Sequence, residues 1–294
     1  MNRVIIIAGP TASGKTDIAI QLAQHFNTEI ISADSRQCFK ELNIGVAKPS
    51  PEQLAAVHHY FINSHSITDN LSAADFERYA LDAADKIFEK SNTAIICGGT
   101  GLYIKAFCEG LDAIPETDPA IKEEIAAGFA AMGIEWLREQ IENEDPIFFE
   151  KGESQNPHRL MRALEVKRST GKSILELQTK LKKERPFEII KICLDLPREV
   201  LYERINHRVD VMMEAGLEEE VKGLLPNKSL NALQTVGYRE LFDYFEGEIS
   251  LARAVELIKQ NTRNYAKRQV TWFKKDDAVK WLKPDDVFDY CKSL

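Results

Sequence analysis

The segment Gly9–Thr16, which reads GPTASGKT, constrains the fold of this chain more than any other stretch. It follows a short apolar run, Val4–Ala8, that is typical of a buried parallel strand. Apolar residues then recur at helical spacing from Ile18 to Phe26. A strand, a glycine-bounded loop, Lys-Thr and a helix are the context that a phosphate-binding loop requires. The sequence therefore predicts an α/β fold and a polyphosphate ligand, but neither the ligand's identity nor the bond that breaks.

Each part of this loop has a physical reason to attract an anion. Its glycines let the backbone turn N–H groups inward, Lys15 adds a point charge, and the helix N-terminus adds a partial positive charge. The hydroxyl of Thr16 stands where such loops hold Mg²⁺. The residues expected to bind the phosphates are Gly9, Pro10, Thr11, Ala12, Ser13, Gly14, Lys15 and Thr16.

Length and composition set the remaining bounds. A chain of 294 residues, 44% of them hydrophobic, suits one large α/β domain or a core domain with an insertion. No run is long enough to span a membrane, and the first apolar run leads directly into the phosphate loop, as a strand does and a signal peptide does not. Five scattered cysteines disfavour a zinc site or a disulfide framework. We therefore expect a cytoplasmic protein.

The net charge of −8 argues weakly against a nucleic-acid partner, because phosphate contacts need Lys and Arg. The distribution of charge matters more than its sum. Residues 135–153 are acidic, whereas residues 158–191 and 251–275 are basic, with Lys259 and Arg263 on one side of a predicted helix. These two basic stretches permit an anionic partner. The alternative interpretation is that they form solvated helix faces.

Two further predicted strands end at informative residues. Asp34 follows the apolar run 29–33, and a carboxylate at this edge of a doubly wound sheet lies where ligands bind. It is a candidate general base or ligand of Mg²⁺-bound water; the alternative is a helix cap. The strand at 93–97 ends in Gly98–Gly101 and not in an acidic residue. Motor and switch NTPases usually have a Mg²⁺-holding Asp there, so its absence indicates another use of the phosphate loop.

The middle of the chain has a different pattern of predicted secondary structure. Helical patterns without a strand run from about residue 111 to 185, and strand character returns at 189–196. The predicted fold is a P-loop NTPase-like parallel sheet flanked by helices, with a discontinuous core of residues 1–110 and 186–294 and an all-helical inserted subdomain at 111–185. The helix after the last core strand carries Arg204 and Arg208 on one face, suited to clamp phosphate charge or simply to face solvent.

Seven motifs occur in order along the chain: GPTASGKT (9–16), SADSRQ (32–37), IGVAKP (44–49), GGTGLY (98–103), HRLMRALEV (158–166), VGYRE (236–240) and KRQVTWF (267–273). Together they resemble bacterial tRNA dimethylallyltransferases, the delta(2)-isopentenylpyrophosphate transferase family, from about residue 3 to 282. The resemblance implies transfer of a dimethylallyl group from dimethylallyl diphosphate to N6 of adenosine 37 in the tRNA anticodon stem-loop, with release of pyrophosphate. It implies Mg²⁺ as cofactor, and we expect a monomer.

The same resemblance implies residue roles. Asp34 would be the general base, Thr11 would contact the bridging oxygen of the donor, and Arg208 would stabilise the departing pyrophosphate. The positions that match tRNA-contacting segments are Asp34, Ser35, Arg36, Gln37, Thr100, Lys122, His158, Arg159, Leu160, Met161, Arg162, Gln234, Thr235, Val236, Gly237, Tyr238 and Arg239. The chain departs from the family pattern at Arg36, where Met is common, and at Gln155-Asn156, where Asn-Asp is common.

Three other functions share some of these features. A small-molecule or nucleotide kinase would use the same phosphate loop, base and arginine helix. An isopentenyltransferase acting on free AMP or ADP would use the same donor. A catalytically silent RNA-binding module would use only the basic stretches. Use of ATP, of AMP, or of neither distinguishes these alternatives from a tRNA prenyltransferase.

Overall fold

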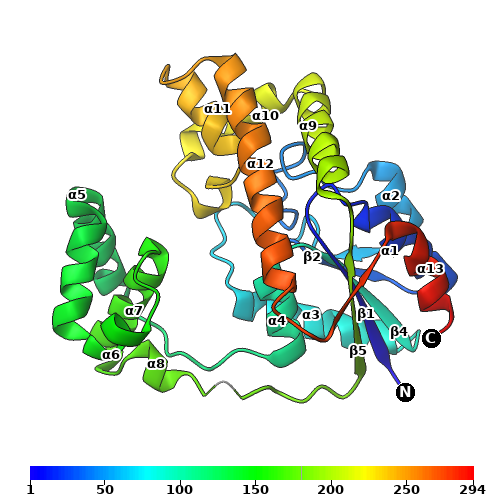
Figure 1. The fold of residues 1–294 in the computed structure, drawn as a ribbon, viewed down its shortest axis with the longest axis horizontal. Helices are drawn as coiled ribbons and strands as arrows, with labels where there is room; N and C mark the ends of the chain where they lie inside the picture. Colours follow the sequence, from blue (N-terminus) through cyan, green and yellow to red (C-terminus); the bar gives the residue numbers. More distant parts are fainter. Residues whose placement is uncertain (180) are drawn as a thin grey trace. The chain divides into compact units, whose positions relative to one another are not determined.

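A computed structural model describes residues 1–294 except residue 180 (Figure 1). It divides the chain into two compact units, Met1–Glu109 with Glu184–Leu294, and Gly110–Lys183. The sequence placed the ends of the inserted subdomain at 111 and 185. In the described residues, no helix combines the length and the apolar character needed to cross a membrane.

The first unit is built on one sheet of parallel strands in the order β3-β2-β4-β1-β5-β6. The strands are β1 (Arg3–Ala8), β2 (Ile30–Ala33), β3 (His59–Tyr60), β4 (Thr93–Gly98), β5 (Glu188–Leu194) and β6 (Val279–Leu282). The central strand β1 pairs with β4 on one side and β5 on the other. This confirms the predicted fold class, a parallel sheet core flanked by helices.

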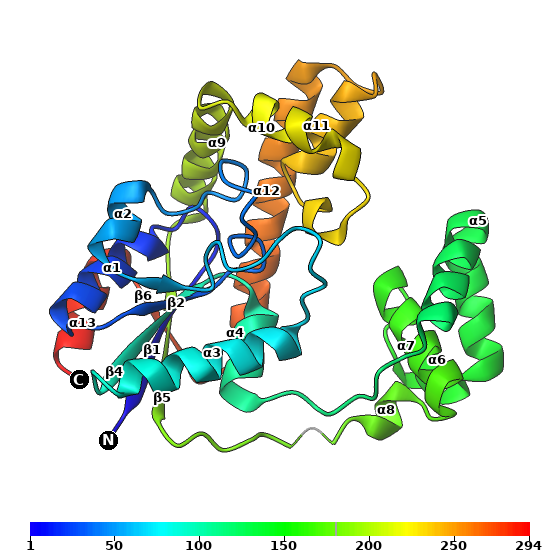
Figure 2. The ribbon, with the colours of Figure 1, turned by 180° about the vertical axis from the view of Figure 1, so that it is seen from behind.

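Helices cover both faces of this sheet (Figures 1 and 2). The helices of the first unit are α1 (Lys15–His25), α2 (Pro51–Ala56), α3 (Ala73–Phe88), α4 (Gly101–Glu109), α9 (Arg198–Glu214), α10 (Leu217–Leu224), α11 (Tyr238–Phe245), α12 (Leu251–Phe273) and α13 (Pro284–Lys292), with short 3₁₀ turns η1 (Leu225–Asn227) and η2 (Asn231–Leu233). Because side chains alternate along a strand, Ile5 and Ile7 pack with α1 and α13, whereas Val4 and Ile6 pack with α3, α4 and α12.

Two edge strands were missing from the sequence prediction. β3 has only two residues and follows shortly after the end of α2. β6 is short and half-buried, so its apolar alternation is weak. Both strands extend an existing sheet edge, and that tertiary pairing, more than local propensity, decides their conformation.

In the described residues of the second unit, all regular secondary structure is helical: α5 (Pro119–Glu144), α6 (Pro146–Lys151), α7 (Pro157–Thr170) and α8 (Ile174–Leu177). Gly133 interrupts α5 with a φ of 76°, so the element consists of two helical segments. Their apolar residues pack on α7 around the buried side chains of Ile125, Leu137 and Leu164. This small core explains why the helical patterns of the sequence continue without a strand.

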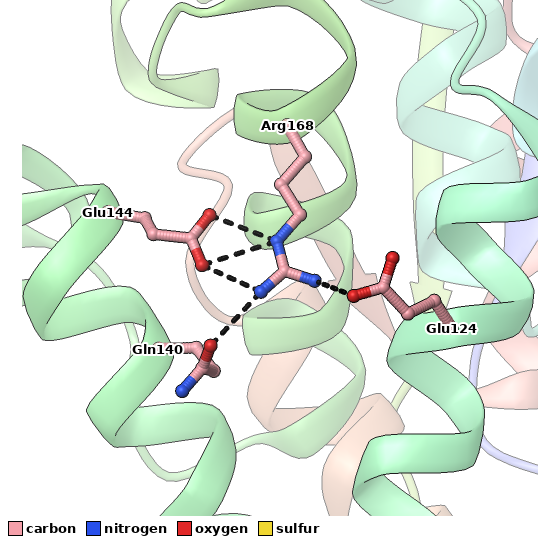
Figure 3. A network of polar contacts seen from close by, with 4 residues as sticks. All are labelled: Glu124, Gln140, Glu144 and Arg168. Carbon is pink, nitrogen blue, oxygen red and sulfur yellow. Dashed lines mark hydrogen bonds and ion pairs between the residues drawn. The ribbon is translucent and has the colours of Figure 1, made fainter.

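A polar network ties α7 to α5 within the helical unit (Figure 3). The Arg168 guanidinium donates to both carboxylate oxygens of Glu144, at 2.6 and 2.9 Å, to Gln140 at 3.1 Å, and to Glu124 at 3.0 Å. Its contact with Glu144 raises the pKa of Arg168. Part of the basic stretch 158–191 is therefore neutralised by the acidic residues of the same unit.

Candidate active site

The phosphate loop connects β1 to α1, as the sequence predicts. Gly14 precedes the helix with a φ of 90°, a conformation that favours glycine. The Lys15 ammonium donates to the carbonyl of Pro10 across the loop at 2.6 Å. Burial lowers the pKa of Lys15. Among the described residues, the fully buried Ser13 hydroxyl has no hydrogen-bond partner. Buried polar groups normally have partners, so the loop suits a polar ligand.

A cavity of about 260 Å³, here called the phosphate cavity, opens over this loop. The loop contributes Thr11 through Thr16 to its walls, whereas Gly9 and Pro10 are buried beneath. The remaining lining residues include Asp17, Asp34, Gln37, Val46, Ala47, Lys48, Cys97, Gly98, Gly99, Arg208, Tyr265 and Gln269. Residues from both ends of the first unit thus converge on the loop.

A second cavity of about 310 Å³, here called the acceptor cavity, adjoins the first. Its polar walls include Ser35, Arg36, Gln234, Thr235, Gly237 and Arg239, and its apolar walls include Val209, Met212, Leu217, Val236 and Ile258. Both cavities are lined by Thr11, Asp34, Val46, Ala47, Arg208 and Tyr265. The proposed base, donor-contacting threonine and arginine therefore all lie at the boundary between the two cavities.

Asp34 is half-buried, holds a turn and lines both cavities. It follows β2, and its Oδ1 accepts hydrogen bonds from the backbone N–H groups of Arg36 and Gln37 at 2.9 and 3.2 Å. These bonds fix the carboxylate, but they close a turn and do not cap a helix as the alternative interpretation expected, since the next helix begins only at Pro51. Within the described residues Oδ2 accepts no hydrogen bond. One carboxylate oxygen thus holds the turn, and the other is left to meet a ligand.

Arg208 lies on α9, and burial lowers its pKa. A guanidinium remains protonated in proteins even so, which leaves a partly desolvated cation at the cavity boundary. Arg204, one helical turn earlier, is exposed and lines neither cavity. The shared helix face predicted for the pair therefore resolves into one cavity residue and one surface residue.

Gln269 is a site residue that the sequence did not single out. From α12 its Oε1 accepts from the N–H of Thr11 at 2.9 Å, and its Nε2 donates to the carbonyl of Gly99 at 2.9 Å. A Cβ on Gly99 would lie 2.2 Å from that amide nitrogen. The glycine run after β4 therefore gives room to side chains of α12, and Gln269 connects it to the phosphate loop.

Thr100, predicted to contact tRNA, serves the same region. Its hydroxyl accepts from the N–H of Ser35 at 3.1 Å, and its own N–H donates to the carbonyl of Ala33 at 3.1 Å. These bonds fix the start of the turn that carries Asp34.

Tyr265, which lines both cavities, is a second residue that the sequence did not single out, and burial raises its pKa to about 12.

The predicted segment 234–239 divides in two. All of it except Tyr238 lines the acceptor cavity. Tyr238 is fully buried and donates from its hydroxyl to Glu220 at 2.6 Å. The side chain of Tyr238 therefore contributes to packing and gives no surface to a partner.

The predicted segment 158–162 opens α7 in the helical unit. His158 and Arg159 are exposed, Met161 is half-buried, and Leu160 is 1% exposed within the core of that unit. Arg162 donates to Thr117 at 3.1 Å. Lys122 is exposed on α5 of the same unit. Leu160 therefore packs inside its unit, while His158 and Arg159 present their side chains to solvent.

The basic side of α12 was expected either to meet an anionic partner or to face solvent, but two of its cations contact another helix. The Lys259 ammonium pairs with Asp210 of α9 at 2.5 Å, and Arg263 donates to Asn206 of α9 at 2.5 Å. Both side chains thus tie two helices of the same unit together. Nearer the end of α12, Lys267 and Lys275 are exposed and line a shallow groove with Trp272.

The described residues contain no group of three or more His, Cys, Asp or Glu side chains that could hold a metal ion by themselves. The phosphate cavity does contain the hydroxyl of Thr16 and the carboxylates of Asp17 and Asp34. Mg²⁺ usually takes one or two protein ligands together with phosphate oxygens and water. This donor set therefore fits Mg²⁺ only as the companion of a polyphosphate.

Comparisons with known proteins identify similar chains. A sequence model of the family described as IPP transferase matches residues 37–276. The tRNA dimethylallyltransferase of Christiangramia forsetii is 48% identical over 296 residues, covering 99% of this chain and 98% of that protein. The Bacillus halodurans tRNA isopentenylpyrophosphate transferase structure is 32% identical with a TM-score of 0.73, covering 100% of this chain and 96% of its own.

A structure of a eukaryotic dimethylallyltransferase acting on tRNA is 26% identical with a TM-score of 0.76, and the match covers 97% of this chain and 74% of that one. The similarity thus extends over the sheet, the phosphate loop and the helical unit alike. This chain belongs to the IPP transferase family.

Proposed function

We propose that the chain transfers a dimethylallyl group from dimethylallyl diphosphate to N6 of adenosine 37 in the anticodon stem-loop of tRNA, releasing pyrophosphate. The names of its relatives support prenyl transfer to tRNA. The observation that carries the residue roles is the boundary between the two cavities, where Thr11, Asp34 and Arg208 lie together. We further propose that the chain acts as a monomer.

The phosphate cavity binds the diphosphate of the donor. Lys15, the N–H groups of the loop and the N-terminus of α1 all offer positive charge to it. The partnerless Ser13 hydroxyl is a further polar group of this loop. When bound, Mg²⁺ would neutralise diphosphate oxygens, held by Thr16 with water and the diphosphate itself. The charge that develops as the C–O bond breaks is met by Arg208.

The acceptor cavity receives the adenine. A base in a stacked anticodon loop must leave the stack to reach a cavity of this kind. Its amine is a weak nucleophile, and it must lose a proton as the N–C bond forms. Asp34 is held by two backbone bonds at the cavity boundary with one oxygen left to accept that proton. Thr11, on the same boundary, orients the bridging oxygen of the donor.

A labelled-donor assay separates this function from its alternatives. Label from dimethylallyl diphosphate is expected in tRNA, with none in AMP. Label in AMP alone would indicate the nucleotide prenyltransferase. Phosphoryl transfer from ATP without donor use would indicate a kinase, and tRNA binding without any product would indicate a silent RNA-binding module.

Because Gln269 connects Gly99 to Thr11, changing its amide should affect how Thr11 meets the donor. Gln269→Glu is expected to slow prenyl transfer about tenfold to a hundredfold, because a carboxylate cannot donate to Gly99 and would misplace Thr11. Single-turnover rates with saturating tRNA measure this effect. Gln260→Glu, at an exposed position of the same helix, makes the same chemical change and is the control. Equal rates for Gln269→Glu and the parent would show that Thr11 does not depend on this amide.

Docking of tRNA should depend on salt in spite of the acidic chain. Each neutralised phosphate of loop RNA contributes a log–log slope of about −0.7. Reversing Lys267 and Lys275 to Glu is expected to weaken tRNA binding and flatten this slope, since both line the exposed groove on α12. Lys259 and Arg263 are unsuitable for this test because their contacts with α9 are structural.

Filter binding at several salt concentrations measures the slope. The double reversal of Lys283 and Lys292, both exposed at the ends of α13, changes the net charge equally and is the control. If both double variants have the same slope as the parent, the end of α12 makes no phosphate contact, and His158 and Arg159 become the candidates to test.

A further inference from the structure

The segment of residues 44–48, here called the 44–48 loop, forms a wall shared by the two cavities. Val46 and Ala47 line both cavities, Gly45 lines the acceptor cavity, and Lys48 lines the phosphate cavity. The loop belongs to no helix or strand, and Ala47 has a φ of 49°. The N–H of Ala47 donates to the carbonyl of Ile44 at 2.9 Å and closes the turn of the loop, and side chains from outside the loop connect it to the rest of the unit.

Gln37 holds one side of this loop. Its Nε2 donates to the carbonyls of Val46 and Ala47 at 3.2 and 2.9 Å, and its Oε1 accepts from the hydroxyl of Ser32 at 3.3 Å. The turn that carries Asp34 and the 44–48 loop are thus connected. Gln37 belongs to a segment that resembles a tRNA-contacting motif, and these bonds use its side-chain amide within the protein.

Glu220 of α10 holds the opposite side. Its carboxylate accepts from the N–H of Ile44 at 2.7 Å and from the N–H of Gly45 at 3.1 Å. It also accepts from the hydroxyl of Tyr238 at 2.6 Å. Hydrogen bonds to an ionised acceptor are roughly twice as strong as neutral ones, so this carboxylate is a strong anchor for two adjacent peptide groups.

The packing of Tyr238 against Gly45 also restricts the position of the 44–48 loop. Tyr238 is fully buried, and its ring lies so close to Gly45 that a Cβ there would be 2.6 Å from a ring carbon. Burial and the neighbouring carboxylate raise the pKa of the Tyr238 phenol, which therefore stays protonated and donates to Glu220. The aromatic ring sets the position of the loop, and the carboxylate fixes its two N–H groups.

We infer that Glu220 is a positioning residue for prenyl transfer, acting through the 44–48 loop, and that Tyr238 acts through Glu220. Neither residue needs to touch a substrate. The shared wall keeps the donor carbon and the acceptor amine at reacting distance, where a displacement of about 1 Å can cost about a hundredfold in rate. The inference rests on the proposed function for the reaction that it supports.

The test compares Glu220→Gln, Glu220→Ala and Tyr238→Phe with Glu219→Gln, a control at the exposed neighbouring position. Glutamine keeps one acceptor oxygen and alanine keeps none. We expect single-turnover rates to fall about tenfold in Glu220→Gln and about a hundredfold in Glu220→Ala. Tyr238→Phe, which retains the ring, should lose less than Glu220→Ala, and Glu219→Gln should match the parent.

Two further readouts separate positioning from loss of folding. Hydrogen exchange of the peptide containing Ile44 and Gly45 should accelerate about tenfold or more in Glu220→Ala but not in the phosphate-loop peptide. KM for both substrates should change along with kcat, whereas a smaller folded fraction would lower kcat alone. Parent-like exchange and kinetics in Glu220→Ala would overturn the inference. An inactive parent chain would instead overturn the proposed function.

Discussion

Replacing Asp34 by asparagine is expected to slow the chemical step of prenyl transfer by about two to four orders of magnitude, as loss of a general base does. Asparagine retains a carbonyl oxygen that can accept the bonds from Arg36 and Gln37, so the turn should keep its shape. It cannot take the proton that leaves N6. Single-turnover rates at saturating donor and tRNA report this step without product release.

The same variant should bind tRNA as the parent does, because removing one basic oxygen leaves the walls of the acceptor cavity in place. Asp34→Ala is a second variant that also removes the hydrogen bonds of the turn. If both variants are slowed equally, the base function dominates. A single-turnover rate for Asp34→Asn within about tenfold of the parent would remove Asp34 from the role of general base.

Arg208→Ala should lower the rate by about two to three orders of magnitude, the usual cost of removing a group that stabilises a developing anion. Pyrophosphate should also become a weaker competitor of dimethylallyl diphosphate, while tRNA affinity stays the same. Lys15→Ala should behave alike, since both cations line the phosphate cavity. Initial rates at several pyrophosphate concentrations measure the competition.

Arg204→Ala is the matched control for this pair, because it removes an exposed arginine one turn away on the same helix. It should leave both the rate and the inhibition by pyrophosphate nearly unchanged. If pyrophosphate inhibits Arg208→Ala and Lys15→Ala as strongly as the parent, these residues do not bind the leaving group.

Local pattern sufficed to predict the core of this molecule. The strand, loop and helix at Val4–Phe26 are encoded by contiguous apolar spacing and by glycines at fixed positions, so the phosphate loop follows from the sequence. The edge strands β3 and β6 do not, because their conformation depends on a neighbour that is distant in sequence. The role of Gln269 in the site could not be predicted for the same reason, because its partner Thr11 is 258 positions away in the sequence.

Charge and motif membership predicted less about individual side chains. Lys259 and Arg263 share a basic helix face, yet both have partners on α9. Leu160 and Tyr238 belong to segments that match tRNA-contacting motifs, yet both are buried. A motif locates a segment, whereas packing decides which of its side chains reach solvent.

The central claim is that the two adjoining cavities join a prenyl donor to an adenine of tRNA. The most direct measurement is nucleoside analysis by mass spectrometry after incubating the purified chain with unmodified tRNA, dimethylallyl diphosphate and Mg²⁺, with pyrophosphate release measured in parallel. We expect N6-dimethylallyladenosine and an equal amount of pyrophosphate, with no product when adenosine 37 is replaced by guanosine. Unchanged nucleosides without pyrophosphate release, or a product that forms regardless of position 37, would contradict the account.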